Sequence, residues 1–225
     1  MWFVVTLVVY LVARRISTKL NFPLFNPLLL SLLVLIPLLM SLEIPYQRYF
    51  ADNTWLNWLL QPAVVALAYS LYQCLPEIRR HWKLILSMCT VGSLLSMLLT
   101  ASFAIQLGAD SQLLATLMGK SVTTPIAMQI ASHLGGIPAV AAIMVIMVGI
   151  FGAIIAYPMF KLLNIQSPLA RGLTMGCVAH AIGTAASVKN EPEDSAYSSL
   201  SLALCGIITS ITASSMMAFA LWINS

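Results

Sequence analysis

The 225-residue chain has a formal net charge of +4 at pH 7, with 60% hydrophobic and only 8% charged residues. A soluble domain carries about 25% charged residues, so this composition excludes a surface that faces water all round. The sequence has no basic face with interleaved aromatic residues, which argues against a nucleic-acid partner. We therefore predict an all-α polytopic membrane protein that is surrounded by the lipid bilayer and forms one integral membrane domain over residues 1–225.

The apolar runs predict membrane-spanning helices. The first run, 2–13, is shorter than the roughly 20 residues that a span needs. Its helix should therefore continue into the basic stretch 14–19, the alternative being that residues are missing at the start of the chain. Asn26 and Pro27 are a typical N-cap and first helical residue. The mixed stretch 43–53 is predicted as a loop. With the first helix we expect about six full transmembrane helices, the others covering residues 27–42, 55–72, 82–107, 137–163 and 195–222.

Two further segments, 111–134 and 168–187, carry polar residues, prolines and glycines within apolar sequence. Unpaired backbone groups cost several kcal/mol in hydrocarbon, so such segments are buried in protein or line a wet cavity. We predict them as two broken or re-entrant segments. If 111–134 re-enters, Lys161 and Arg171 join the basic loops on the cytoplasmic side, as the positive-inside rule favours. Paired proline-broken segments also favour an inverted-repeat transporter fold, with chance similarity between apolar sequences as the alternative.

The first of these segments has the residues of an anion site. Thr124 and Pro125 resemble a helix start, whose free N–H groups would point back toward Lys120, Ser121 and Thr123. A helix N-terminus together with an ammonium group and hydroxyls suits a carboxylate. The alternative is that Lys120 reaches the membrane interface and the hydroxyls only satisfy a kink.

The second segment has a candidate site of its own. Gly172, Gly176, His180 and Gly183 or Thr184 recur at steps of three and four, so they should form one helical stripe that faces the bundle. An ionisable residue in that position suggests proton coupling or substrate contact. The alternative is a histidine hydrogen-bonded across a helix interface.

The remaining polar residues predict neither a cofactor nor an enzyme. Glu191 and Asp194 are predicted as solvated loop acids. Ser121 and His180 could form a nucleophile–base pair, but the spans offer no acidic residue to orient the histidine and no glycine-flanked nucleophile turn. We expect no metal and no disulfide, because the cysteines lack paired spacing and are interpreted as isolated packing residues, namely Cys74, Cys89, Cys177 and Cys205.

Over essentially its whole length the chain resembles the LrgB/CidB family of bacterial inner-membrane proteins. The resemblance lies in seven motifs: NPLLL at 26–30, LLQPAVVALAY at 59–69, KSVTTPIA at 120–127, GGIP at 135–138, ARGL at 170–173, HAIGT at 180–184 and LCGIITS at 204–210. Two positions depart from the family pattern: Gly119, where relatives often have proline, which should loosen the approach to the site, and Ala186, where they often have arginine.

The resemblance implies two kinds of function. One is transport of small monocarboxylates such as pyruvate, glycolate or glycerate, with Lys120, Ser121, Thr123, Thr124 and His180 lining the site, helped by Gly183 and Thr184. The other is an antiholin-like or holin-like regulator of murein hydrolases and autolysis, without carrier activity. Both imply a multi-pass protein of the bacterial inner membrane. The expected protein partners are a small LrgA/CidA-type membrane protein and further copies of the chain.

Overall fold

The computed structural model describes residues 1–20, 25, 27–59, 62, 65, 72 and 75–223. The described residues form helices joined by short turns, with no strand among them, as the predicted all-α class requires. The chain divides into two compact units, Met1–Ala66 and Leu67–Ser225.

The described part of the first unit has two longer, mostly apolar helices followed by two short ones. Its helices are α1 (Trp2–Leu20), α2 (Pro27–Ser41), α3 (Tyr46–Asp52) and α4 (Thr54–Trp58). Helix α1 continues through the basic stretch 14–19, as its short apolar run predicted. The predicted loop over 43–53 is wrong, because Pro45 starts the short helix α3 there. Asn26 and most of the predicted span 55–72 lie outside the described residues.

Helices α1 and α3 are joined by polar contacts. Thr6 Oγ1 lies 2.9 Å from Tyr49 Oη, and the Trp2 backbone N–H donates to Asp52 Oδ2 at 3.2 Å. The Trp2 N–H is also the main reason why the pKa of Asp52 lies below its ordinary value.

The second unit is built on α6 (Leu75–Gln106), α9 (Pro138–Leu162) and α11 (Pro192–Ile223). In the described part of the chain these three helices are long and apolar enough to cross a membrane, over Arg79–Gln106, Pro138–Leu162 and Pro192–Ile223. They match three of the predicted spans. Their outer faces are exposed and apolar; on α6 this face carries Leu84, Met88, Val91, Leu95 and Leu99.

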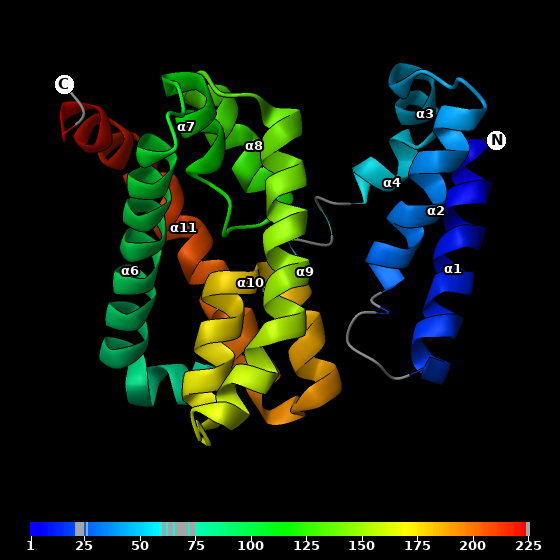
Figure 1. Ribbon diagram of the computed structural model, residues 1–225. Coiled ribbons are helices and arrows are strands. Elements are labelled where there is room, and N and C mark those ends of the chain that lie inside the picture. Colours follow the sequence, from blue (N-terminus) through cyan, green and yellow to red (C-terminus); the bar gives the residue numbers. More distant parts are fainter. Residues whose placement is uncertain are drawn as a thin grey trace. The chain divides into compact units, whose positions relative to one another are not determined.

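The predicted break in segment 111–134 is present. Helices α7 (Ser111–Leu117) and α8 (Thr124–His133) lie between the end of α6 and the start of α9, and the chain between them turns back toward the end from which it came (Figure 1). Thr116 closes this hairpin, because its Oγ1 accepts the Ile137 N–H at 2.8 Å. Gly136 is required beside it, since a Cβ there would lie 2.6 Å from the Thr116 nitrogen. We call α7, α8 and the turn 118–123 the first hairpin.

The second atypical segment is also a hairpin. Helix α10 (Pro168–Asn190) has a non-helical residue, His180, at φ 42° and ψ −134°. A Cβ on Gly183 would lie 2.6 Å from the Met175 carbonyl oxygen, whereas eight residues of a straight helix span about 12 Å. Helix α10 therefore folds back on itself at His180. From this turn, both arms extend toward the same end of the unit (Figure 1). We call it the second hairpin.

This reversal corrects the predicted single stripe. Gly172 and Gly176 lie on the first arm and pack against α11, where added Cβ atoms would meet Tyr197 and the Leu202 nitrogen. Gly183 lies on the second arm and packs against the first. The stripe is therefore divided at His180. The glycines do serve close backbone approach, as their small size predicted.

Each hairpin has its own part of the core. A cluster with Leu114, Ala127, Ile130, Val145 and Ala213 encloses the first hairpin. A second cluster joins the second hairpin to α6 and α11, and a third joins it to α9. The described part of the second unit thus has three candidate spans that hold two hairpins, which lie at opposite ends of the unit (Figure 1).

Candidate functional site

The turn of the first hairpin gathers an ammonium group and two hydroxyls. Lys120 Nζ donates to Ser121 Oγ at 3.1 Å and to Ser96 Oγ at 3.3 Å, and the two hydroxyl oxygens lie 2.9 Å apart. All three residues are half-buried. Two hydroxyl contacts leave the Lys120 charge without an acidic partner among the described residues.

The start of α8 lies beside this group. Thr123 is the N-cap, in an extended conformation, and Pro125 lies in the first turn. Thr123 Oγ1 is buried and makes no capping bond, and it has no other hydrogen-bond partner in the described part of the chain. The first N–H groups of a helix have no partner within the helix. At the N-terminus of α8, three residues after Lys120 in the chain, Thr123 therefore has an unpaired hydroxyl, and the Thr124 and Ile126 N–H groups have no acceptor within the helix.

Gly119 does not loosen this turn, contrary to expectation. It is buried, and a Cβ there would lie 2.9 Å from Ala127 Cα. Glycine allows the turn to pack directly on α8, and a proline at this position would collide with the helix in this conformation.

The turn of the second hairpin is built around His180. His180 is only 2% exposed, and its Nε2 lies 2.8 Å from the Val145 carbonyl oxygen on α9. Gly149 makes room for the ring, because a Cβ there would lie 2.6 Å from His180 Cε1. Thr184 Oγ1 donates to the His180 carbonyl oxygen at 3.0 Å and lies 2.8 Å from Ser198 Oγ. The position agrees with the predicted bundle-facing histidine, and the Val145 contact agrees with the alternative of a bond across a helix interface.

The predicted site residues thus form two groups, one at each hairpin turn. No hydrogen bond joins the two groups within the described ranges. They do approach the same level of α6. Ser96 contacts Ser121 of the first hairpin, and Gly92 lies against Cys177 of the second. Four residues of a helix span about 6 Å, so the hairpins meet α6 one turn apart.

Helices α11 and α9 show the same approach. On α11, Cys205 contacts the first arm of α10, and the next residue, Gly206, lies against Ile126 of α8. On α9, Val145 packs in the core around the first hairpin while its carbonyl contacts His180. All three candidate spans therefore touch both hairpins at neighbouring positions.

A buried ion pair anchors the base of the second hairpin. Arg171 Nε and Nη2 donate to the two carboxylate oxygens of Asp194, each at 2.9 Å, and Tyr157 Oη donates to Asp194 Oδ2 at 3.0 Å. Asp194 is completely buried in the first turn of α11. Its prediction as a solvated loop acid is therefore wrong, because Arg171 and Tyr157 compensate its charge. Glu191 does remain largely exposed, 3.8 Å from Arg171.

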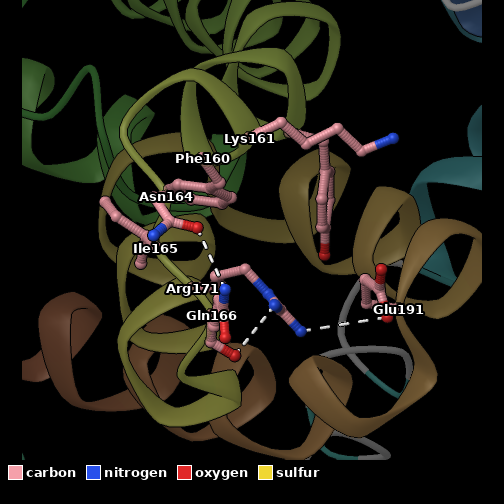
Figure 2. A pocket seen from close by; sticks show the side chains of 8 residues that line it. Phe160, Lys161, Asn164, Ile165, Gln166, Arg171 and Glu191 are labelled. Atoms are coloured by element: carbon pink, nitrogen blue, oxygen red, sulfur yellow. Dashed lines mark hydrogen bonds and ion pairs between the residues drawn. The ribbon is translucent and has the colours of Figure 1, made fainter.

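A pocket of about 270 Å³ opens beside this pair (Figure 2). It is lined by Tyr157, Phe160, Lys161, Asn164, Ile165, Gln166, Arg171 and Glu191. Three nitrogen atoms of Arg171 already donate to Asp194 or to the Gln166 carbonyl oxygen. The polar groups around Arg171 thus satisfy one another, and the pocket is separate from Lys120. We regard it as part of the anchor of the second hairpin.

The sequence did not predict two polar features of the second unit. Ser96 lies in a span that looks uninterrupted, although a polar stripe at steps of four, three and four could have indicated it: Cys89, Ser93, Ser96 and Thr100. Three of the cysteines interpreted as isolated come together in space, since Cys177 Sγ lies 2.8 Å from Cys205 Sγ and 4.0 Å from Cys89 Sγ.

Comparison with known proteins gives the family. The LrgB-like family matches residues 6–219. The chain is 43% identical over 201 residues to an uncharacterized protein of Haemophilus influenzae, covering 89% of this chain and 87% of that protein. It is 31% identical over 206 residues to the holin-like protein CidB of Staphylococcus epidermidis, covering 92% and 90%. No solved structure matches. With its apolar spans and this match over nearly the whole sequence, the chain is a membrane protein that belongs to the LrgB-like family.

Proposed function

We propose that the protein carries small monocarboxylates, of the pyruvate, glycolate or glycerate type, across the bacterial inner membrane, with a small LrgA/CidA-type partner. The substrate carboxylate binds between the hairpin turns, at Lys120, Ser121, Thr123 and Thr124. His180, Gly183 and Thr184 form the opposite wall.

The observation that carries this proposal is the pairing of Lys120 with the start of α8. A lysine ammonium, hydroxyl donors and a helix N-terminus all favour an anion. Lys120 is held by Ser96 and Ser121 without a carboxylate partner among the described residues, and Thr123 Oγ1 is buried and unpaired. A carboxylate would complete the bonding of both residues.

The two hairpins supply the architecture that a carrier needs. Secondary transporters bind solutes near the membrane midplane, between discontinuous helices whose ends point at the substrate. Irregular backbone at that depth is tolerated where it is buried or lines a cavity. The two hairpin turns have this character, which supports an inverted-repeat arrangement.

Charge supports a multi-pass orientation. The start of α6 and the end of α9 lie at the same end of the second unit (Figure 1). That end carries Arg79, Arg80, Lys83, Lys161 and Arg171. Since basic residues favour the cytoplasmic side, the second hairpin enters from the cytoplasm and the first from the opposite side.

Uptake of radiolabelled pyruvate and glycolate into proteoliposomes tests the proposal, with the protein alone and together with its partner. We expect saturable uptake, at least a tenfold loss in Lys120→Ala, and a smaller loss in Thr123→Val. Lys189→Ala and Thr212→Val are matched controls, because Lys189 is exposed and Thr212 already donates to the Ile208 carbonyl. Uptake that Lys120→Ala leaves unchanged would contradict the site, and no saturable uptake under either condition would contradict the carrier.

The second candidate is a holin-like or antiholin-like regulator of autolysis, favoured by the name of the staphylococcal relatives. A regulator of this kind acts through assembly with its partner and not through a solute site. It predicts that a deletion strain shows altered autolysis. A gene with Lys120→Ala should then return autolysis to normal as fully as the unaltered gene does. A carrier predicts that Lys120→Ala fails to restore any phenotype that depends on uptake.

A further inference from the structure

The cysteines of the second unit form a cluster that the proposed carrier site does not use. Cys89 on α6, Cys177 on the first arm of α10 and Cys205 on α11 place their sulfur atoms within 4.8 Å of one another. Cys89 and Cys205 are fully buried, and Cys177 is half-buried. We call these three residues the thiol cluster, and we propose that it binds one Cu(I) ion per chain.

The geometry suits a single ion held by three sulfurs. A metal ion about 2.3 Å from each of three sulfur ligands holds them roughly 4 Å apart. The Cys89–Cys177 separation is already 4.0 Å, whereas Cys177 and Cys205 are 2.8 Å apart and have to separate. Gly92 leaves space for the Cys177 side chain to rotate, because even an added Cβ there would lie 3.7 Å from Cys177 Sγ. Small side-chain rotations therefore suffice.

The ligand set selects a soft ion of low coordination number. Thiolates prefer Cu(I), zinc or iron–sulfur clusters. Structural zinc almost always has four ligands, drawn from cysteine, histidine and carboxylates, and the cluster joins only the three thiols in the described part of the chain. Cu(I) is stably bound by three sulfurs. Each thiol that binds as a thiolate releases one proton to solvent.

Two further observations support a ligand at this place. Ser93 follows Cys89 by four residues and so lies on the same face of α6. Its Oγ is buried and has no hydrogen-bond partner among the described residues, although a thiolate ligand would accept one. Cys177 is half-buried, which gives an ion a route into the cluster.

The purified protein, reduced and kept free of oxygen, can be titrated with Cu(I) in the presence of a chromogenic Cu(I) chelator. We expect one Cu(I) per chain to resist the chelator, at least a tenfold weaker retention in Cys177→Ser, and X-ray absorption with sulfur neighbours only. Met97→Leu is the matched control, since it removes a buried thioether from the same helix and should keep the ion. Zn(II) should be retained more weakly than Cu(I).

Equal retention by Cys177→Ser, or no retention by the unaltered protein, would overturn the proposal. If Cys177→Ser does not fold, alkylation of the unaltered protein replaces it. One equivalent of Cu(I) should then protect Cys177, the half-buried member of the thiol cluster, from N-ethylmaleimide, as read by mass spectrometry of its peptide. Unchanged alkylation of Cys177 would overturn the proposal equally.

Discussion

His180 has a backbone conformation that is rare for any residue except glycine. Its φ of 42° is combined with a ψ of −134°, and such conformations cost about 1–3 kcal/mol and persist where the surroundings determine them. Here the surroundings are the two arms of α10, the Val145 carbonyl and the space left by Gly149. The side chain is retained at a backbone position that would suit glycine better.

Two substitutions distinguish the effect of the His180 backbone on stability from the effect of its ring. His180→Ala loses the contact with Val145 and keeps the unfavourable φ, whereas His180→Gly loses the contact and relieves the backbone. We expect His180→Gly to be more stable than His180→Ala by about 1 kcal/mol. Thermal unfolding in detergent measures this, and an alanine variant as stable as the glycine variant would contradict the reversal at His180.

At single positions, the sequence was most informative where a residue is unusual for its surroundings. Lys120 and His180 stand out in apolar sequence, and both lie at hairpin turns. Cysteine and serine do not stand out, because both are common in buried helices as small residues. Spacing along α6 could have indicated that Cys89 and Ser96 share one face, but their partners Cys177 and Ser121 lie on other elements and only the fold brings them together.

Among the elements, α10 depends most on polar anchoring. Its first arm is joined to α11 by the bidentate bond from Arg171 to Asp194, and α9 contributes the hydroxyl of Tyr157. Removing one partner of a buried ion pair leaves the other charge uncompensated, which costs more than the intact pair contributes.

Three substitutions at this anchor should differ in a fixed order. Asp194→Asn should destabilise the protein by about 3–5 kcal/mol, and Tyr157→Phe by about 1 kcal/mol, because Arg171 still compensates the carboxylate. Glu191→Gln should cost no more than about 1 kcal/mol, since that pair is exposed. Thermal unfolding measures the series, and an Asp194→Asn variant no less stable than Glu191→Gln would contradict the buried pair.

Local signals predicted the breaks in the helices but not all of their consequences. Thr124-Pro125 marks the start of α8, and Ser167-Pro168 marks the start of α10. The reversal within α10 has no proline and no glycine at its turn, so a continuous stripe was the natural expectation. The charges of Arg171 and Asp194 are 23 residues apart in sequence, and only the fold-back of α10 brings them together.

On the scale of the whole molecule, the first hairpin determines the orientation of everything after it. If residues 111–134 return to the side from which they came, α6 and α9 run in opposite directions across the membrane. In Figure 1 the two helices do run in opposite directions. The basic ends of these helices then lie on one side, which is the arrangement that the positive-inside rule favours.

Labelling of single added cysteines tests this arrangement. Leu107 precedes the first hairpin, His133 ends it, and Leu162 ends α9; all three are exposed. A membrane-impermeant maleimide should label Leu107→Cys and His133→Cys from one side of the membrane and Leu162→Cys from the other, each above the labelling of the unaltered protein. Labelling of His133→Cys from the side opposite to Leu107→Cys, with Leu162→Cys on the same side as Leu107→Cys, would show that 111–134 crosses.

The antiparallel arms of each hairpin carry backbone dipoles that oppose each other. A helix end carries about half an elementary charge, positive at the N-terminus and negative at the C-terminus. At the first turn the end of α7 meets the start of α8, and at the second turn the two arms of α10 meet in the same way. The opposed dipoles largely cancel at a distance, so each hairpin adds little field beyond its turn. The pull of a helix end on an ion is then confined to the space around the turns.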